Sequence, residues 1–289
     1  MLSDYTICLN QSVGEGTFSV VKAFHKRTHK PAVAKIMKLN SHSIAQFTLE
    51  CKILSKLNEG RNPNIIKMYT YGVQNDTGII VMERMDEDLL DVILEKDLTA
   101  SQQMDIFHQI CLGIKQCHDN NIAHLDIKPE NILVSTKDDG SFIVKLIDFG
   151  GAQFMKNGKV TDAAGTLHYL SPEIFHHHRV DGRKADIWSL GILMHVLSST
   201  TWPYLPSDSN RIGDVISKGE LTYSGDLNQS QKKLITTLLK RTPKRRPSID
   251  DILGSEFLLP FSPLSKSRST SLRRNIPKQL LRKFLNHTL

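Results

Sequence analysis

The sequence predicts an α+β protein in which a strand-rich N-terminal third precedes a mainly helical remainder. Two patterns support this prediction. Residues 5–39 and 64–83 carry short alternating or continuous apolar runs, as β-strands do, whereas an apolar period near 3.6 residues appears at 41–57 and at 101–121. The 289 residues suit one large domain or two small ones. We therefore expect two lobes, one built on a sheet and the other on helices.

The first strands flank a glycine-containing turn in the run Val13–Val21. Gly14 and Gly16 allow the backbone to come close to a ligand, and successive N–H groups of such a turn can bind phosphate. A lone Gly-x-Gly pattern is also compatible with a simple hairpin. The next strand contains Ala32-Val33-Ala34-Lys35, which puts a single lysine within an apolar run.

The first helical segment has Ser41 or Ser43 as its N-cap candidate and carries Glu50, which in isolation would be a solvated glutamate. Its apolar positions are Ile44, Phe47, Ile53, Leu54 and Leu57. Two further strands are expected, at 64–66 and at 78–83. After them the pattern becomes helical, so the larger part of the chain is expected to be mainly α-helical.

Two polar loops follow. The helix at 101–121 leads into His124–Asn131, whose sequence is HLDIKPEN, and a short strand at 142–147 leads into Asp148-Phe149-Gly150. Loops held by rigid elements are where catalytic groups are usually found.

The residue types in these loops suit phosphoryl transfer. Oxygen ligands at Asn131 and Asp148 fit a hard cation such as Mg²⁺. Asp126 is then free to orient a hydroxyl nucleophile, and Lys128 can offset charge on a transferring phosphoryl group. A single aspartate in a loop is more often a helix cap or turn former, but the combination at this spacing makes that explanation improbable.

The segment His124–Asn131 resembles the catalytic loop of protein kinases, and Asp148-Phe149-Gly150 resembles their metal-binding turn. The resemblance covers residues 5–258. It implies a two-lobed protein-kinase-like fold, with a small N-lobe of antiparallel sheet plus one helix and a larger, mainly helical C-lobe. The implied boundaries are a kinase domain at 1–258, with the N-lobe at about 1–83, the hinge at 83–88 and the C-lobe at 89–258, and a basic tail at 259–289.

The resemblance implies ATP and Mg²⁺ as the bound groups. It assigns catalysis to Asp126 and Lys128 and metal binding to Asn131 and Asp148. The nucleotide-binding residues that it implies are Val13, Gly14, Gly16, Val21, Lys35, Glu50, Glu83, Met85 and Leu133. Among these, Glu50 would pair with Lys35, and the backbones of Glu83 and Met85 would bond the adenine. Met82 would be the gatekeeper, and Asp88 would reach the ribose.

Residues 151–170 resemble an activation loop that ends before Ser171-Pro172-Glu173. The resemblance implies that Thr166 bonds the catalytic Asp and Lys and that Lys128 marks the serine/threonine branch. It also implies that Asp186 bonds the backbone of the catalytic loop and that Arg246 pairs with Glu173.

Two histidine features are expected to be structural or exposed. His124 lies beside the catalytic Asp, but in the family this residue packs and hydrogen-bonds rather than acting as a base. The run His176-His177-His178 suggests a metal site, yet adjacent side chains point in different directions, so a solvated loop is expected.

The chain departs from the family at three positions. Ser19 replaces the third loop glycine, Val33 replaces the alanine above the adenine, and Leu125 replaces the arginine that normally receives the activation-loop phosphate. Without that arginine, we hypothesise that activity does not require activation-loop phosphorylation. Loss of activity on dephosphorylation of Thr161 would contradict this hypothesis.

Composition describes an ordinary globular chain with 39% hydrophobic and 23% charged residues. The N-terminus has no basic stretch followed by an apolar run, and no segment reaches the ~18 apolar residues of a membrane helix. Cys8, Cys51, Cys111 and Cys117 show no metal spacing, so reduced, mostly buried thiols are expected. We expect an intracellular protein, cytoplasmic and/or nuclear, without a nucleic-acid partner.

The basic tail, residues 259–289, accounts for the whole excess of basic over acidic residues in the chain. After Glu256 there are seven basic residues and no acid, and removing these seven from the 37 basic residues leaves 30 against 30 acids. Several serines and threonines lie among them, a composition typical of disorder or phosphorylation sites. The apolar residues on one face of a predicted helix are Ile276, Leu280, Leu281, Phe284 and Leu285.

Four explanations of this basic amphipathic helix remain open. It could be a calmodulin-type target, a membrane-surface anchor, a pseudosubstrate that folds onto the acidic hinge side, or a helix packed on the kinase body. The acidic hinge side comprises Glu87, Asp88, Asp91 and Glu95. Truncation at Leu259 distinguishes these explanations of the helix, since raised activity supports autoinhibition and lost solubility supports packing on the kinase body.

The sequence thus predicts an ATP- and Mg²⁺-dependent serine/threonine kinase acting on protein Ser/Thr hydroxyls. A pseudokinase scaffold is the alternative, but it predicts a lost catalytic residue and none is lost. A small-molecule kinase is disfavoured by Thr166 and Ser171-Pro172-Glu173. Glu130 and the acidic hinge side further suggest a preference for basic substrates.

Overall fold

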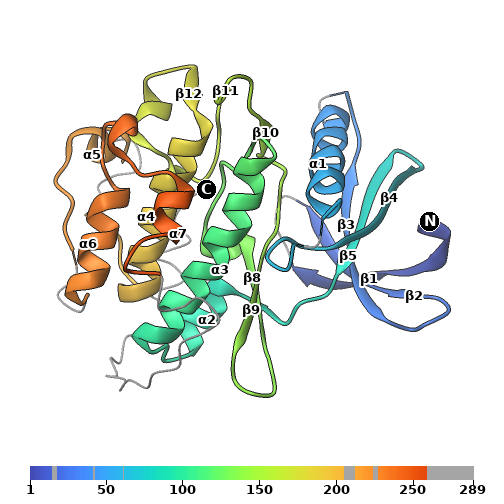
Figure 1. The fold of residues 1–289 in the computed structure, drawn as a ribbon. Coiled ribbons are helices and arrows are strands. Elements are labelled where there is room, and N and C mark those ends of the chain that lie inside the picture. Colours follow the sequence, from blue (N-terminus) through green and yellow to red (C-terminus); the bar gives the residue numbers. More distant parts are fainter. Residues whose placement is uncertain (15–17, 42, 61, 205–211, 224–226, 259–289) are drawn as a thin grey trace.

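Two lobes make up the computed structural model, a smaller one with strands β1–β5 and helix α1 and a larger one with helices α2–α7 (Figure 1). The described residues are 1–14, 18–41, 43–60, 62–204, 212–223 and 227–258. This arrangement confirms the predicted two-lobed α+β fold.

The sheet of the smaller lobe is antiparallel, with strand order β1-β2-β3-β5-β4. Its strands are β1 (Tyr5–Gly14), β2 (Ser19–His25), β3 (Pro31–Lys38), β4 (Met68–Gln74) and β5 (Thr77–Glu83), preceded by the 3-10 helix η1 (Leu2–Asp4). Helix α1 (Ser43–Asn58) packs on one face through buried residues such as Phe47 and Leu54. The other face of the sheet forms a small apolar cluster of its own with Val21, Ala34 and Val81.

The start of α1 differs from the prediction. Asn40 Oδ1 accepts a hydrogen bond from the Ser43 amide at 2.9 Å, and Ser43 Oγ accepts one from the Asn40 amide at 2.8 Å. Asn40, rather than Ser41, therefore supplies the reciprocal bonds that satisfy this helix end. Ile44 is 49% exposed and does not belong to the buried face.

The predicted strand at 64–66 is wrong, because β4 begins at Met68. Ile65 and its neighbours instead bond the larger lobe: the Ile66 amide donates to Leu146 O at 3.0 Å, and the Leu146 amide donates to Asn64 O at 2.9 Å. The backbone N–H and C=O groups of this apolar stretch pair with a strand that lies more than 75 residues later in the chain. No local sequence pattern indicates that pairing.

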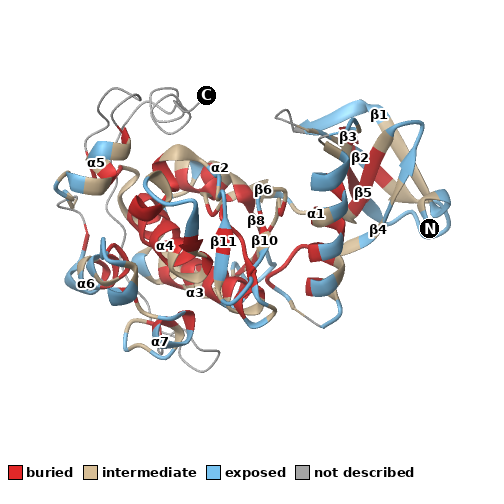
Figure 2. Ribbon diagram, turned by 90° about the horizontal axis from the view of Figure 1, so that it is seen from above, coloured by how far each residue is buried: buried red, intermediate tan, exposed pale blue. Residues whose placement is uncertain are grey.

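The core of the larger lobe lies around α3 and α4, where buried residues gather in Figure 2. Its helices are α2 (Leu89–Glu95), α3 (Ala100–Asp119), α4 (Gly182–Ser199), α5 (Ile212–Lys218), α6 (Gln229–Leu238) and α7 (Ile249–Leu253). Thr99 begins α3 with a capping box, in which its Oγ1 accepts from the Gln102 amide and Gln102 Oε1 accepts from the Thr99 amide. No helix in the described part of the chain is long and apolar enough to cross a bilayer.

Short strands and 3-10 helices hold the loops between these helices. The strands are β6 (Glu87–Asp88), β7 (Ile122–Ala123), β8 (Ile132–Thr136), β9 (Phe142–Leu146), β10 (Gln153–Phe154), β11 (Lys159–Thr161) and β12 (Arg179–Asp181). The 3-10 helices are η2 (Pro129–Asn131), η3 (Leu167–Tyr169), η4 (Pro172–Phe175) and η6 (Pro243–Arg245). The β8–β9 hairpin joins the two polar loops, so it positions the predicted catalytic residues.

All four cysteines are free, and Cys51, Cys111 and Cys117 are buried while Cys8 is half-buried. Burial raises the pKa of the Cys51 thiol to about 12 and raises the pKa of Cys111 and of Cys117 as well. The predicted reduced, mostly buried thiols are confirmed, and the three buried ones are poor nucleophiles.

Candidate active site

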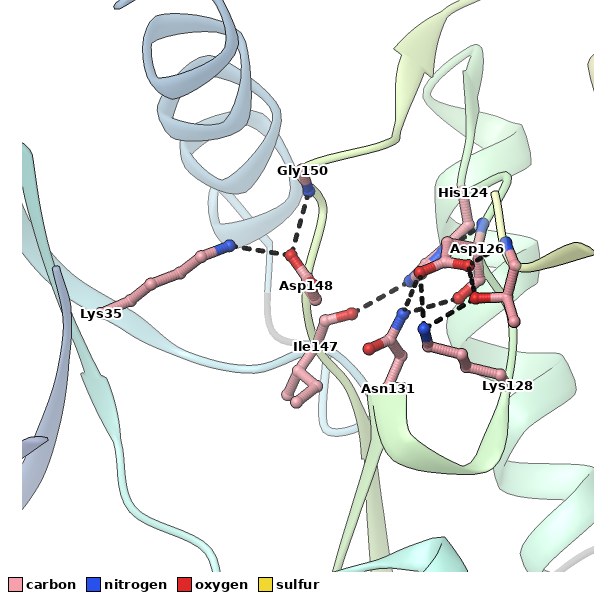
Figure 3. Close-up of polar contacts among 9 residues, drawn as sticks. Lys35, His124, Asp126, Lys128, Asn131, Ile147, Asp148 and Gly150 are labelled. Atoms are coloured by element: carbon pink, nitrogen blue, oxygen red, sulfur yellow. Dashed lines mark hydrogen bonds and ion pairs between the residues drawn. The ribbon is translucent and has the colours of Figure 1, made fainter. Parts of the chain in front are cut away.

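Lys35 bonds two carboxylates, Glu50 of its own lobe and Asp148 of the larger lobe, and the contact with Asp148 is drawn in Figure 3. Its Nζ lies 2.6 Å from Glu50 Oε1 and 2.8 Å from Asp148 Oδ1. The strand register positions this ammonium, because Lys35 is in β3 opposite Ile80 of β5, next to the face that α1 covers. The predicted pairing of Lys35 with Glu50 is confirmed, and Asp148 joins it.

Burial and charge compete in this cluster. Burial alone would lower the pKa of Lys35, but the charges of Glu50 and Asp148 outweigh it and raise the pKa. Burial would raise the pKa of Asp148, and the Lys35 charge and hydrogen bond outweigh that effect and lower it. Burial raises the pKa of Glu50 despite the opposing Lys35 charge. The ammonium therefore stays charged with an ionised Asp148 beside it.

The catalytic loop holds Asp126 from three sides. Asn131 Nδ2 donates to Asp126 Oδ2 at 2.7 Å and to its backbone oxygen at 2.8 Å. Thr166 donates to Asp126 Oδ1 through its amide at 2.9 Å and through its hydroxyl at 2.8 Å. Lys128 Nζ donates to Thr166 Oγ1 at 2.7 Å and lies 3.4 Å from Asp126 Oδ2. The predicted bonds of Thr166 to Asp126 and Lys128 are confirmed.

Gly165 makes this approach of the activation loop feasible. A Cβ at Gly165 would lie 2.4 Å from the backbone oxygen of Leu125, which no real side chain tolerates. Only glycine lets the loop run this close to the catalytic loop, and the next residue is Thr166.

Asp186 organises the backbone of the same loop from α4. Its carboxylate accepts from the His124 amide at 3.0 Å, from the Leu125 amide at 2.9 Å, and contacts His118 Nε2 at 2.9 Å. Leu125 has a positive φ of 66°, an uncommon conformation for this residue type that these bonds help to hold. His124 Nε2 lies 3.1 Å from Ile147 O, so His124 has the predicted structural position.

Glu173 and Arg246 form the predicted ion pair, which is buried. Arg246 also donates to the backbone oxygens of Lys184 and Lys240, so its guanidinium ties η6 to α4 and to the end of the activation segment. The predicted exposure of His176–His178 is confirmed as well.

Apolar side chains fill the position next to the catalytic loop where the family has an arginine. Leu125 is buried at 4% exposure. The cluster around it consists of Ala123, Met155, Val160, Val180 and Ala185, which come from β7, the activation segment, β12 and α4. Pairing of β11 with β12 and of β10 with β7 holds the same segment through backbone bonds.

Two residues of α1 contact the activation segment and were not predicted. Gln46 Nε2 donates to Gly150 O at 3.1 Å, and Lys52 Nζ lies 5.6 Å from the ring centroid of Phe154. Gln46 lies four residues before Glu50, on the same face of the helix, so helical periodicity offered a signal for it. Nothing in the sequence marks Phe154 as the partner of Lys52.

The predicted nucleotide-binding residues are only partly described. Gly16 lies outside the described residues, Gly14 ends β1, and Val13 is 49% exposed. Val21 is buried in the smaller lobe, while Leu133 is half-buried on β8.

The hinge is tied to the larger lobe. The Glu83 amide donates to Lys67 O at 2.9 Å, and Glu83 Oε1 lies 2.8 Å from Lys145 Nζ of β9 in the larger lobe. Met85 is half-buried, and its sulfur accepts from Ser135 Oγ at 3.7 Å. Asp88 Oδ1 accepts a hydrogen bond from the Asp91 amide, so Asp88 is the N-cap of α2. The sequence predicts a ribose contact for Asp88 but does not predict this cap.

Glu130 lies in η2, close enough to Asp126 for their charges to interact. Burial raises the pKa of its carboxyl group, and the nearby charges of Asp126 and Asp88 raise it further, against the opposing effect of Lys128. Its Oε2 is shielded from solvent and has no hydrogen-bond partner among the described residues. Three carboxyl groups, those of Glu130, Asp126 and Asp88, thus lie close enough to interact, with Lys128 as a neighbouring cation.

A two-lobed fold with a buried Lys–Glu–Asp cluster opposite an Asp–Lys–Asn loop defines a phosphotransferase class. The sequence matches the family model of the protein kinase domain over residues 8–258, so the chain belongs to the protein kinase family. This finding confirms the fold and the family that the motifs predicted.

Curated relatives are protein kinases, and several of them are named serine/threonine kinases. The chain is 32% identical to serine/threonine-protein kinase PSK2 of Saccharomyces cerevisiae, over 89% of the chain and 24% of that protein. It is 30% identical to the ovarian-specific serine/threonine-protein kinase Lok of Drosophila melanogaster, over 91% of the chain and 59% of that protein. It is also 30% identical to calcium-dependent protein kinase 5 of Plasmodium falciparum, over 98% and 50%. The chain thus spans a quarter to three fifths of these relatives.

Proposed function

We propose that the protein is an ATP-dependent serine/threonine protein kinase that transfers the γ-phosphoryl group to Ser and Thr hydroxyls of protein substrates. The observation that carries this proposal is the bonding of Asp126 to Asn131, Lys128 and Thr166, opposite the Lys35–Asp148 pair. These contacts support the proposal because they hold the side chains that would orient the substrate hydroxyl and bind phosphate.

Each side chain has a proposed role. Lys35 binds the α- and β-phosphates, and Glu50 holds Lys35 in place. Asp126 orients the substrate hydroxyl and accepts its proton as the oxygen attacks. Lys128 offsets the charge on the transferring group, which is the main source of rate in this chemistry.

Mg²⁺ is the proposed metal, and the donor set fits it. Asn131 turns its amide nitrogen to Asp126, so its amide oxygen faces the other way, towards the side of Asp148 (Figure 3). Among the described residues no cluster of three His, Cys, Asp or Glu side chains could hold a metal by itself. One carboxylate plus one amide oxygen, with the remaining positions left to phosphate and water, is the usual binding mode of Mg²⁺.

Transfer of radiolabelled phosphate from ATP to mixed peptide acceptors tests this proposal. The wild type should label Ser- or Thr-containing peptides, and Asp148→Ala should lose the labelling by roughly 10²-fold or more. Nucleotide binding by the wild type without any labelling would instead support the alternative, a pseudokinase scaffold.

We further propose that activity is independent of activation-loop phosphorylation. Apolar packing of Leu125 against Met155 and Val160 supports this, because it orders the segment without a phosphate receptor. Asp162, directly after Thr161 and β11, places a carboxylate 3.2 Å from Nδ1 of His178, which directly precedes β12. Thr161→Ala should therefore keep wild-type activity after phosphatase treatment, whereas Thr166→Val should lose activity because Thr166 bonds Asp126.

A preference for basic substrates is also proposed. The unpartnered Oε2 of Glu130 beside Asp126 and Asp88 supports it, because a substrate cation would interact favourably with these carboxyl groups. A positional peptide library should show a gain from Arg or Lys near the acceptor, and Glu130→Gln should reduce that gain. Equal labelling of neutral and basic peptides would rule the preference out.

The location and the tail's partner stay predictions. Reduced thiols at Cys8, Cys51, Cys111 and Cys117 support an intracellular protein. The proposed calmodulin-like or membrane-surface partner would bind residues 259–289, which lie outside the described residues.

A further inference from the structure

Helix α1 holds Asp148 from one side through Glu50. Glu50 Oε1 lies 2.6 Å from Lys35 Nζ, and the same ammonium lies 2.8 Å from Asp148 Oδ1. Asp148 is the proposed metal-binding carboxylate, and its backbone has a positive φ of 55°. A positive φ is uncommon outside glycine, so a turn that contains one depends on the contacts around it. A further contact that fixes this turn therefore affects how the carboxylate is oriented.

Gly150 makes such a contact. Its amide donates to Asp148 Oδ1 at 3.3 Å, as Figure 3 shows, and its carbonyl oxygen accepts from Gln46 Nε2 at 3.1 Å. A Cβ at Gly150 would lie 3.2 Å from Asp148 Oδ1 and 3.4 Å from Gln46 Nε2, so both side chains pack closely around this glycine. The two backbone groups of one residue thus bond the metal-binding side chain and helix α1.

Gln46 and Glu50 are four residues apart, so they lie on the same face of α1. Through Lys35, Glu50 reaches Asp148. Through Gly150, Gln46 reaches the same carboxylate. One helix therefore holds Asp148 by two routes, one through a buried ammonium and the other through neutral hydrogen-bonding groups.

We propose that Gln46 is a positioning residue for the phosphoryl transfer, which keeps Asp148 in its metal-binding orientation by holding Gly150. This inference rests on the proposed kinase function. The donor is a neutral amide and the acceptor a backbone carbonyl, so the contact requires no phosphate on the activation segment. Gln46 is exposed, and the loss of one such hydrogen bond should weaken metal-dependent binding about three- to tenfold.

The test compares Gln46→Met with the control Thr48→Val in the full chain. Both positions are exposed on α1, and each substitution removes one side-chain hydrogen bond while keeping a side chain of similar size. The Thr48 hydroxyl bonds Ile44 O within the helix, whereas the Gln46 amide bonds Gly150 outside it. Glutamine and methionine have similar helix propensities, as have threonine and valine, so both variants should fold.

Nucleotide binding gives a readout that needs no phosphoryl transfer. Calorimetric titration with ADP is done once with Mg²⁺ and once with EDTA, and the ratio of the two affinities measures the gain from the metal. Gln46→Met should reduce the wild-type gain about three- to tenfold and leave binding in EDTA unchanged. Thr48→Val should keep the wild-type gain. An equal loss in both variants would reveal an effect of helix stability alone and would overturn the inference.

Hydrogen exchange and kinetics give two further readouts. Without nucleotide, the amides of residues 149–152 should exchange about three to ten times faster in Gln46→Met than in the wild type, while those of α4 should not change. In peptide labelling, Gln46→Met should raise the KM for Mg²⁺-ATP and leave the KM for the peptide at the wild-type value. Thr48→Val should match the wild type in both measurements.

The remaining outcomes separate the two proposals. A Gln46→Met variant with the wild-type gain from Mg²⁺, whether or not its exchange is faster, overturns this inference and leaves the kinase function intact. A wild type that binds Mg²⁺-ADP with the expected dependence on Gln46 but labels no peptide overturns the kinase function and leaves the support of Asp148 by Gln46 intact. A wild type that gains nothing from Mg²⁺ overturns the inference together with the proposed metal site.

Discussion

Arg246 and Glu173 meet in a two-pronged ion pair, although 73 residues separate them in the chain. Nη1 lies 2.6 Å from Oε1 and Nη2 lies 2.7 Å from Oε2, and the Arg246 side chain is fully buried, stacked at 5.1 Å from the Trp188 ring centroid. Parallel N–H···O bonds of this kind fix orientation as well as distance. The pair therefore fixes the end of the activation segment to the larger lobe.

Removing one partner of this pair should destabilise the fold. Arg246→Leu leaves the Glu173 carboxylate buried and unpaired, which typically costs about 3–5 kcal/mol of unfolding free energy. The double variant R246L/E173L should recover part of that loss, because no charge is then left uncompensated. Urea unfolding of the single and double variants measures both effects, and Arg245→Leu, at an exposed neighbour, is the control. Equal stability of R246L and R245L would contradict the prediction.

Lys35→Met should strongly reduce transfer, and it should also lower the unfolding free energy because it leaves the buried Glu50 carboxylate without its cation. The substitution leaves Glu50 and Asp148 without their shared cation, so bound phosphates lose their main positive contact. We expect labelling of an external peptide to fall by roughly 10²-fold or more. Lys38→Met, at the exposed end of the same strand, is the matched control and should behave as the wild type. Comparable activity of the two variants would mean that Lys35 does not bind phosphate.

Leu125→Ala should loosen the activation segment. It removes side-chain volume from the apolar cluster with Met155 and Val160, which we expect to cost about 2–5 kcal/mol in unfolding free energy. Activity should fall as well, since Thr166 approaches Asp126 from this segment. Leu112→Ala, at a position 38% exposed, should change neither quantity by much. Denaturant titration together with peptide labelling distinguishes the two variants.

Stability should decrease in mildly acidic solution. Burial lowers the pKa of His168 and of His195 below the ordinary value of 6.5. As pH falls through 6.5 the unfolded chain binds protons that the folded protein does not, so the unfolding free energy falls from about pH 6.5 down to the folded pKa values. Above that window this contribution is complete and does not depend on pH.

Urea midpoints between pH 8 and pH 5.5 measure this dependence. His168→Gln should flatten the curve, while His177→Gln, at an exposed position, should leave it unchanged. A wild-type midpoint that stays level across the range would contradict the assignment of neutral buried imidazoles.

The sequence predicts the catalytic loops well because their chemistry constrains residue type and spacing. Asp126, Asn131 and Asp148 occupy short loops whose polar residues have few other uses, and the strands and helices around them are strongly periodic. The same constraint explains why the sequence predicts the hydrogen-bond partners of Thr166 and Asp186.

Features that depend on contacts between distant segments were missed. Asn64–Ile66 looks like a strand, but its backbone bonds β9 instead of the sheet. The contact of Lys52 with Phe154 and the pair of Glu83 with Lys145 join segments about 60 to 100 residues apart, and neither side chain has a local pattern that reveals its partner. Local periodicity contains no information about such pairs.

The backbone hydrogen bonds between Asn64–Ile66 and β9 attach one part of the smaller lobe to the larger lobe. Asn58, the last residue of α1, donates to Ile66 O at 3.2 Å and accepts from the Met68 amide at 3.0 Å, so this end of α1 is fastened to the larger lobe. Lys35 belongs to the sheet and is bonded to Asp148 of the larger lobe. A rotation of the sheet about this fastened end of α1 would therefore have to break that bond.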